Sequence, residues 1–165
     1  MNATEKWLPV VGWEGLYEVS DLGRVRSLDR LDARGNRRTG KLLAQSTLTC
    51  GHRLVKLCRL GLHTTFQVHR LMLTAFVGAC PPGMEACHRN DVPDDNRLVN
   101  LRWGTRSENQ RDSVRNGTHY FAARTQCPNG HQYNEVNTYN TPDSRRDCRA
   151  CRQRASQRRR ARKAA

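Results

Sequence analysis

The clearest candidates for chemistry in this chain are one histidine and two asparagines. His88, Asn100 and Asn109 follow one another at intervals of 12 and 9 residues. A histidine side chain titrates near neutral pH, so His88 could take a proton from water. An asparagine oxygen can bind a hard divalent cation, and Asn109 is suited to that role. A general base beside a bound cation would support the hydrolysis of a phosphodiester.

These residues need elements that hold them near one another. The sequence predicts a strand, a turn, a second strand and a helix, over residues 84–88, 90–96, 98–103 and 106–116. Thr105 and Glu108 have the spacing of a capping box, and Gly117 suits the position after the helix. Asn109 would then lie near the start of the helix, where free N–H groups favour a phosphate.

The same stretch resembles the active-site core of the HNH endonucleases. The resemblance covers residues 68–117, and it rests on the spacing above together with Asp95-Asn96, Asn100-Leu101-x-Trp103, Glu108-Asn109 and His69-Arg70-Leu71. It implies a ββα-metal fold that cleaves DNA with water activated by His88. A single cation, Mg²⁺ or Mn²⁺, would be bound by Asn109, and Asn100 would brace the loop that carries the base.

One position departs from that family pattern. Related homing-type enzymes often carry a metal-binding carboxylate immediately before the catalytic histidine, and this chain has Cys87 there. A thiol suits soft metals, whereas Mg²⁺ prefers oxygen. Cys87 is therefore either a second cation ligand or a small buried residue. The residues nearby that could supply a ligand in its place are Glu85, Asp91, Asp94, Asp95 and His69.

A second group of metal-binding residue types lies further along the chain. Its pattern is C-x3-H and then, after 16 residues, C-x2-C, formed by Cys127, His131, Cys148 and Cys151. Such pairs of soft ligands are typical of structural Zn²⁺, and four ligands leave no open position for catalysis. A thioredoxin-like redox pair is the alternative, but no βαβ pattern surrounds the C-x2-C.

The first 28 residues contain a second resemblance. Short strands are predicted around 16–19 and 24–28, with a turn at 21–23, and we expect Trp7, Trp13 and Tyr17 to pack a small core, with base stacking as the alternative. The Gly-x-Glu-Gly-x-Tyr-Glu-Val-Ser and Gly-Arg-Val-Arg-Ser-Leu runs resemble the NUMOD-type DNA-binding module that often precedes HNH nucleases. We expect Arg24 and Arg26 to contact DNA.

Between these two stretches the signals are local. Residues 29–42 are polar and basic and are expected to form an exposed loop, in which Arg37 and Arg38 could contact phosphates. Residues 52–68 predict a hairpin around Gly61, and residues 69–76 predict a short buried helix closed by Gly78. The remaining cysteines have no metal spacing and are expected to be small buried side chains: Cys50, Cys58 and Cys80.

The charge of the chain indicates a polyanionic partner. Lys and Arg number 29 against 15 Asp and Glu, which gives a net charge of +14 and favours nucleic acid. The tail 145–165 is strongly basic and is expected to be helical or to order on DNA, with Arg158, Arg159 and Arg160 contacting phosphates. No apolar run could span a membrane, and no secretory signal precedes the first module, so the expected compartment is a reducing cytoplasm, that of a bacterial host if the protein is phage-encoded.

The predicted fold class is α+β: a small ββα-metal core with a β-rich module before it and a zinc-stapled segment after it. The predicted boundaries are 1–45, 46–120 and 121–165, and the low apolar share, 36%, favours several small cores. The predicted protein is a monomeric, metal-dependent endonuclease acting on double-stranded DNA, with no small-molecule substrate. The rival is a non-catalytic DNA-binding protein derived from an HNH nuclease, and an RNA-directed factor has little support because the chain shows no aromatic stacking platform.

Overall fold

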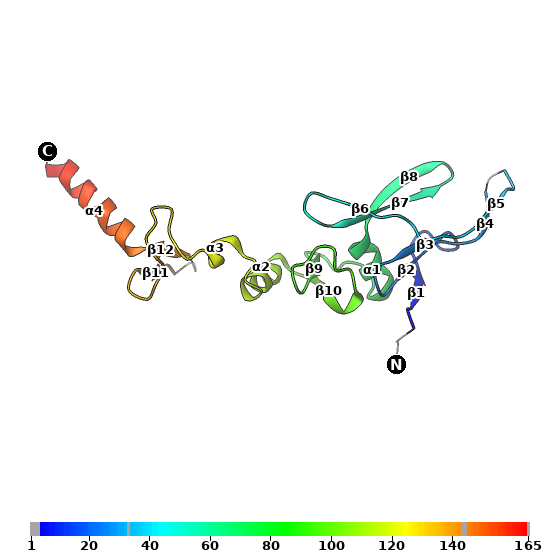
Figure 1. The fold of residues 1–165 in the computed structure, drawn as a ribbon, viewed down its shortest axis with the longest axis horizontal. Helices are drawn as coiled ribbons and strands as arrows, with labels where there is room; N and C mark the ends of the chain where they lie inside the picture. Colours follow the sequence, from blue (N-terminus) through cyan, green and yellow to red (C-terminus); the bar gives the residue numbers. More distant parts are fainter. Residues whose placement is uncertain (1–3, 33, 143–144, 165) are drawn as a thin grey trace. The chain divides into compact units, whose positions relative to one another are not determined.

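A computed structural model describes residues 4–32, 34–142 and 145–164 (Figure 1). The chain divides into two compact units, Met1–Asn116 and Gly117–Ala165, which we call unit 1 and unit 2. Both units contain helices and strands, which confirms the predicted α+β class. Within the described residues no helix is both long enough and apolar enough to cross a bilayer.

Unit 1 begins with a three-stranded antiparallel sheet of β1 (Trp7–Pro9), β2 (Tyr17–Ser20) and β3 (Val25–Ser27). This confirms the strands and turn predicted within residues 16–28. Tyr17 is buried, and the Trp13 ring packs edge-on against it at 5.7 Å. The prediction is wrong for Trp7, which lies outside the core, because its ring is covered by the Arg26 guanidinium at 4.2 Å.

The segment predicted as a loop contains a small hairpin. Two-residue strands β4 (Arg30–Leu31) and β5 (Arg37–Arg38) pair antiparallel, so the prediction of a loop is wrong at these positions, although three of the four residues are exposed as expected. Asp32 closes the turn, since its Oδ1 accepts hydrogen bonds from the backbone N–H groups of Arg34 and Asn36. These hydrogen bonds of the Asp32 side chain order the turn, and the polar composition of the segment does not indicate them.

A second sheet joins β6 (Ser46–Thr47), β7 (Arg53–Arg59) and β8 (Leu62–Gln67). The predicted hairpin is confirmed. Its turn is made by Leu60 and Gly61, which both have positive φ angles, 51° and 82°. That conformation matches the twist of a two-residue hairpin and explains why a glycine lies there.

Helix α1 (Val68–Phe76) follows β8 directly and lies at the centre of unit 1. It confirms the predicted buried helix, and five of its nine residues are buried. The helix packs on β1 and β2, on β7 and β8, and on β9 (Glu85–His88) and the 3₁₀ turn η1 (Leu98–Asn100) of the following region. The core is therefore one cluster, and the prediction of several small cores is wrong for unit 1 because α1 is apolar enough on several faces to join them. The cluster consists of Val10, Tyr17, Val19, Val25, Val55, Leu57, Val68, Leu71, Met72, Leu73 and Leu101.

The last part of unit 1 contains β9 (Glu85–His88), the 3₁₀ turn η1 (Leu98–Asn100), β10 (Leu101–Gly104) and α2 (Arg106–Arg115). Strands β9 and β10 pair antiparallel with Leu101 opposite His88. The predicted strand over 98–103 is wrong in its first half, because residues 98–100 turn so that the Asn100 side chain reaches back into the loop. The capping box of Thr105 and Glu108 is confirmed, and Gly117 follows with φ at 73°.

Unit 2 consists of a short helix α3 (Tyr120–Ala123), a two-stranded sheet of β11 (Thr138–Asn140) and β12 (Arg146–Cys148), and the helix α4 (Arg149–Ala164). The basic tail is thus helical over the described residues up to 164, and none of the α4 side chains is buried.

Three cysteines do not occupy the positions expected of them. Cys50 is exposed, and Cys58 and Cys80 are half-buried, so the prediction of small buried side chains is wrong for all three. Cys58 lies near the end of a hairpin strand and Cys80 beside a turn, where the chain has little apolar material to cover them. Cys87 is the buried cysteine of unit 1.

Candidate active site and metal cluster

The predicted base lies at the end of β9, where the antiparallel register brings it beside the loop before η1. His88 is buried, with 6% of its surface exposed, and its Nε2 lies 3.1 Å from Asn96 Oδ1. An amide oxygen only accepts hydrogen bonds, so Nε2 carries the proton in this arrangement. The Nδ1 atom is then the one with a lone pair, and it is the atom able to take a proton.

Asn100 ties the intervening loop together. Its Nδ2 donates to Asn90 Oδ1 at 2.9 Å and to the Asp95 carbonyl at 2.8 Å, while its Oδ1 accepts from the Asn90 backbone N–H at 3.2 Å. The backbone N–H of Arg89 also donates to the Asn100 carbonyl. With 7% of its surface exposed, Asn100 is buried, and its polar atoms are satisfied within the loop.

A carboxylate holds the outer side of the same loop. Asp95 accepts hydrogen bonds from Asn90 Nδ2 and from two guanidinium nitrogens of Arg97 at 2.7 Å. These hydrogen bonds lower the pKa of Asp95 from 3.8 to about 2, and the Arg97 side chain has the largest effect. Asp95 is thus committed to the loop as an anion at neutral pH.

Two further histidines surround His88. Its ring lies 5.1 Å from that of His69 and 5.5 Å from that of His52, and those two rings are 4.8 Å apart. His69 is buried, and its Nδ1 has no hydrogen-bond partner. Burial, followed by the charges of His88 and His52, lowers the pKa of His69 to about 3, so this ring is neutral at physiological pH.

The predicted cation ligand lies on the first turns of α2. Asn109 is half-buried, and its Nδ2 donates to Glu85 Oε1 at 3.0 Å, which brings the amide next to the exposed carboxylate at the start of β9. Of the replacement ligands suggested by the sequence, the structure therefore brings Glu85 into contact with Asn109. The donor set of Glu85 and Asn109 is rich in oxygen, which suits Mg²⁺ or Mn²⁺.

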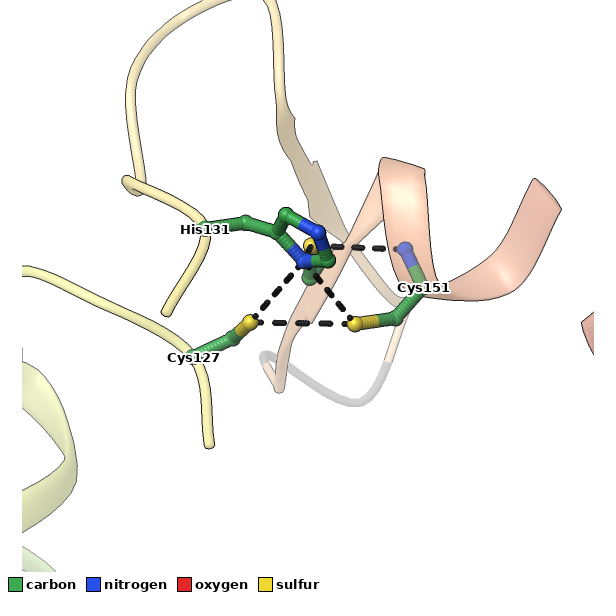
Figure 2. A group of neighbouring side chains, drawn as sticks. Cys127, His131 and Cys151 are labelled. Atoms are coloured by element: carbon green, nitrogen blue, oxygen red, sulfur yellow. Dashed lines mark hydrogen bonds between the residues drawn. The ribbon is translucent and has the colours of Figure 1, made fainter. Parts of the chain in front are cut away.

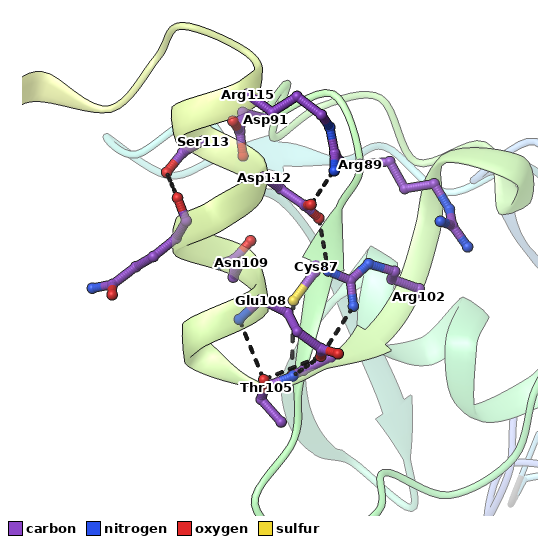
Figure 3. A network of polar contacts seen from close by, with 12 residues as sticks. Cys87, Arg89, Asp91, Arg102, Thr105, Glu108, Asn109, Asp112, Ser113 and Arg115 are labelled. Atoms are coloured by element: carbon purple, nitrogen blue, oxygen red, sulfur yellow. Dashed lines mark hydrogen bonds and ion pairs between the residues drawn. The ribbon is translucent and has the colours of Figure 1, made fainter. Parts of the chain in front are cut away.

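Cys87 is part of the interior. It is 1% exposed, and its Sγ lies 3.5 Å from the Glu85 carbonyl and 3.9 Å from the Gly104 carbonyl. Burial raises the pKa of the Cys87 thiol, so the neutral form is favoured. Figure 3 shows the sulfur beside the first turns of α2. A neutral buried thiol at this place does not fit a hard cation.

An ion-pair network fixes α2 against β10 (Figure 3). Arg102 Nη2 lies 2.7 Å from Asp112 Oδ2, and Arg115 Nη2 lies 2.6 Å from Asp112 Oδ1. Asp112 is buried, and the Arg102 guanidinium lowers the pKa of that carboxyl. Since Asn109 is one turn away from Asp112, this clamp also sets the position of the Asn109 amide.

Four supporting residues were not assigned their observed roles from the sequence. Asn96 and His69 are within the family motif, but nothing in their spacing indicates that they contact His88. His52 reaches the site from a segment distant in sequence. Asp112 lies only one turn beyond Asn109, but no local pattern indicates its ion pair with Arg102. Only the loop carboxylate, Asp95, could have been assigned from its turn chemistry.

Unit 2 holds a cluster of four metal-binding side chains (Figure 2). Their ligand atoms all lie within 4.8 Å of one another, and the residues are the predicted Cys127, His131, Cys148 and Cys151. The His131 Nδ1 atom lies 3.3 Å from two sulfurs and 3.6 Å from the third, and the sulfurs of Cys127 and Cys151 are 3.7 Å apart. Tetrahedral Zn²⁺ with bonds of 2.0–2.3 Å would require separations of about 3.5–3.8 Å.

Amide groups support that cluster from outside. Asn129 Nδ2 lies 3.1 Å from Cys151 Sγ, and Asn137 Nδ2 lies 3.4 Å from Cys148 Sγ. Burial raises the pKa of the Cys148 thiol, but the N–H groups of Cys151 and Asn137 outweigh it and lower that pKa to about 6. The cluster is thus arranged to carry the thiolate that a metal requires.

The predicted DNA-contacting arginines of unit 1 are engaged with carboxylates. Arg24 pairs with Glu5, Arg26 with Glu18, Arg37 with Asp29 and Arg38 with Asp32. Arg24 and Arg26 also lie over the Trp7 ring. The hairpin of β4 and β5 forms one wall of a groove of about 1380 Å³, and the turn of β7 and β8 forms another. Its basic lining residues are Arg30, Arg34, Arg37, Arg38, Lys41 and Arg59.

In unit 2 the other three predicted contacts, Arg158, Arg159 and Arg160, are exposed on α4. Of the seven predicted arginines, four thus belong to unit 1 and three to unit 2.

Comparison with known proteins identifies two stretches of the chain. Residues 5–58 match the NUMOD4 motif, and residues 66–111 match the HNH endonuclease family. The chain is 32% identical over 113 residues to the DNA endonuclease I-HmuI of Bacillus phage SP01. The aligned residues make up 68% of this chain and 60% of that protein. A solved structure titled "DNA binding and cleavage by the HNH homing endonuclease I-HmuI" also matches this chain, with a TM-score of 0.57. The match is 32% identical and covers 68% of this chain and 60% of that one. The chain therefore spans 60% of the length of that relative, and neither family match reaches the cluster of unit 2.

Proposed function

We propose that this chain, whose residues 66–111 match the HNH endonuclease family, hydrolyses phosphodiester bonds of double-stranded DNA in a metal-dependent reaction. The observation that carries the proposal is the hydrogen bond between His88 Nε2 and Asn96 Oδ1, because it leaves Nδ1 able to accept a proton. His88 would take that proton from the attacking water. Asn100 would hold the loop, and so the base, through its three side-chain hydrogen bonds.

The proposed cation site is formed by Asn109 and Glu85. The contact between their side chains supports this pairing, because both can offer oxygen to Mg²⁺ or Mn²⁺. When bound, the cation would neutralise charge on the scissile phosphate and on the leaving oxygen. We leave Cys87 out of the site, because it is buried and its thiol is favoured in the neutral form.

The proposed partner is DNA, bound by a monomer in the cytoplasm of a bacterial host if the protein is phage-encoded. The net charge of +14 supports a polyanion, and so do the basic groove of unit 1 and the exposed arginines of α4. The ion pairs of Arg24, Arg26, Arg37 and Arg38 are exposed on at least one side, and such pairs are weak enough to exchange for phosphate.

The proposed metal of unit 2 is Zn²⁺. The separations between the ligand atoms and the three cysteine donors support this choice. With four protein ligands filled, the ion would hold β12 and α4 to the loop of Cys127 and His131. We propose a domain order in which a DNA-binding module, an HNH core and this zinc module follow one another, with boundaries near residues 45 and 120.

Nicking of supercoiled plasmid tests the proposed reaction. Wild-type protein is expected to nick with Mg²⁺ or Mn²⁺, and His88→Ala is expected to be slower by about 10²–10⁴-fold, as for the loss of a general base. His119→Ala is the matched control, since His119 caps the short helix α3 of unit 2. Equal nicking by wild type and His88→Ala across both cations would overturn the proposal.

A second candidate function is favoured by one observation, the buried Cys87 in place of a carboxylate. A chain with a weakened cation site could bind DNA without cutting it. In that case wild type would bind DNA with salt-dependent affinity, and neither cation would produce nicks above the level of His88→Ala.

A further inference from the structure

A turn of the N-terminal module lies directly on the loop that carries Asn96. The turn between β2 and β3 reaches this loop, and the Asp21 carbonyl accepts a hydrogen bond from the Leu98 backbone N–H at 2.9 Å. Gly23 faces Asn96 so closely that a Cβ added to it would lie 2.6 Å from Asn96 Cβ and 3.0 Å from the Asn96 carbonyl oxygen. The two backbones therefore meet with no space for a side chain at Gly23.

The turn itself is held from several directions. Ser20 is completely buried, and its Oγ accepts hydrogen bonds from the backbone N–H groups of Leu22 and Arg24. Gln45 Nε2 donates to the Gly23 carbonyl at 2.8 Å. Gly23 also has a φ of +79°, which glycine adopts without strain. A turn fixed in this way can act as a firm wall for the loop beside it.

Asn96 carries this contact to the base. Its side chain is 5% exposed, and its Oδ1 is the atom that faces His88 Nε2. A shift of Asn96 by a few tenths of an ångström would lengthen or misalign that hydrogen bond, and the ring would be deprived of the partner that sets its tautomer.

We infer that the N-terminal module positions the general base, with Gly23 and Asn96 as positioning residues for His88. The module would therefore have a role in cleavage besides any contact with DNA. This inference rests on the proposed function, because it assigns to Asn96 the orientation of a proposed base. It concerns the geometry of the imidazole, so it has a readout that does not require cleavage.

The first test is Gly23→Ala, with Gly15→Ala as the matched control. Gly15 lies in the same module and has a similar φ of +74°, but an added Cβ there would meet no atom within 4 Å. Both substitutions carry the strain of positive φ, and only Gly23→Ala presses on Asn96. We expect Gly23→Ala to lower kcat by at least tenfold relative to Gly15→Ala, with DNA affinity changed less than threefold.

The second readout is the tautomer of His88. In wild type, long-range ¹H–¹⁵N spectra of ¹⁵N-histidine-labelled protein should show the His88 ring protonated at Nε2, identified by comparison with His88→Gln. Gly23→Ala should convert this signal to a tautomer mixture, and Gly15→Ala should not. If wild type cuts no DNA but the Gly23 effect on the signal is present, the proposed function fails and the positioning role stands.

Two other variants keep the inference testable should Gly23→Ala not fold. Gln45→Ala removes the hydrogen bond to the Gly23 carbonyl and should lower kcat more mildly. Asn96→Leu should remove the acceptor and lower kcat strongly, whereas Asn96→Asp keeps an acceptor and should retain more activity than Asn96→Leu. If Gly23→Ala folds, a kcat equal to that of Gly15→Ala with an unchanged His88 signal would overturn the inference. If it does not fold, a wild-type kcat and an unchanged His88 signal in Gln45→Ala would overturn it.

Discussion

The two candidate metal-binding regions of this molecule differ in how complete they are. In unit 2, four ligand atoms already lie within 4.8 Å of one another, and amide N–H groups support their sulfurs. In the candidate active site, Asn109 and Glu85 contact each other, His88 is held by Asn96, and Cys87 is turned into the interior. Over the described residues, the unit 2 cluster is the one place where three or more His, Cys or carboxylate donors converge.

This difference reflects what each metal has to do. A structural ion is held by a closed ligand set, so its protein donors must be complete. A hydrolytic ion needs open positions for phosphate and water, so few protein donors suffice and the surrounding hydrogen bonds take on the work of orientation. Four experiments test this difference between the two regions.

The largest effect is expected in unit 2. Cys148→Ala should release the bound metal and unfold unit 2, since structural zinc contributes about 10–16 kcal/mol of apparent binding free energy to such small modules. Metal analysis and ¹H–¹⁵N spectra should show this change while the signals of unit 1 persist. Cys80→Ala, a half-buried cysteine outside the cluster, is the control. A folded, metal-free unit 2 would remove the contrast.

The next effect concerns Cys87. Cys87→Asp should raise nicking with Mg²⁺ by about 10–100-fold, because a carboxylate at the position before His88, beside the first turns of α2, would offer a hard donor (Figure 3). The buried carboxylate should also make Tm depend on Mg²⁺ concentration. Cys87→Ser, of similar size but without charge, is the control and should show neither change. Equal nicking by both variants would mean that the position is not near the cation.

A third effect is on the pH dependence of stability. His69 has a folded-state pKa of about 3 against 6.5 in the unfolded chain, so the unfolded state binds the proton first. The contribution of His69 to the free energy of unfolding is fully present above about pH 6.5 and is lost as the pH falls from there towards 3. Between pH 7.5 and 5.0 this decline amounts to about 2 kcal/mol, and His69→Leu should lack it. Urea unfolding at pH 7.5 and 5.0 gives the change in the free energy of unfolding for each protein. Comparing this change between wild type and His69→Leu removes any effect of the substitution on packing that is the same at both pH values. An equal decline in both would contradict the assignment.

The smallest effect is expected from α4. Replacing Arg158, Arg159 and Arg160 together by Ala should weaken DNA binding about tenfold at moderate salt and reduce the salt slope by about 0.9 for each phosphate that is no longer neutralised. The kcat at saturating DNA should not change. The control on the same helix is the triple alanine variant of Gln153, Ser156 and Gln157, and fluorescence anisotropy over a salt series gives the slopes. An unchanged slope would show that the helix does not contact DNA.

The sequence predicts those features that depend on local spacing. The cysteine pairs, the capping box of Thr105 and Glu108, and the turn at Leu60-Gly61 each involve residues a few positions apart, and all agree with the structure. The strand over 98–103 and the loop over 29–42 were wrong, because a single side chain, Asn100 or Asp32, redirects the backbone there. Periodicity contains no information on such bonds.

The support of the site could not be predicted for a different reason. The contact of Gly23 with Asn96 joins residues far apart in the chain, and so does the approach of His52 to His88. Such contacts depend on how two sheets pack on one helix. The same holds for the single core, since composition alone favours several.

The shared core around α1 has a consequence for exchanging parts between related proteins. A fragment cut near residue 45 would separate Val55, Leu57 and Leu71 from Val10, Tyr17 and Val19, which belong to the same core cluster. Swapping the whole first module would therefore mean redesigning the interior on both sides of the junction. None of the described residues of the β4–β5 hairpin belongs to this core cluster, although the Arg30 guanidinium lies over the ring of the core residue Tyr17. The hairpin could therefore be exchanged with little change to the interior, provided that Arg30 is kept.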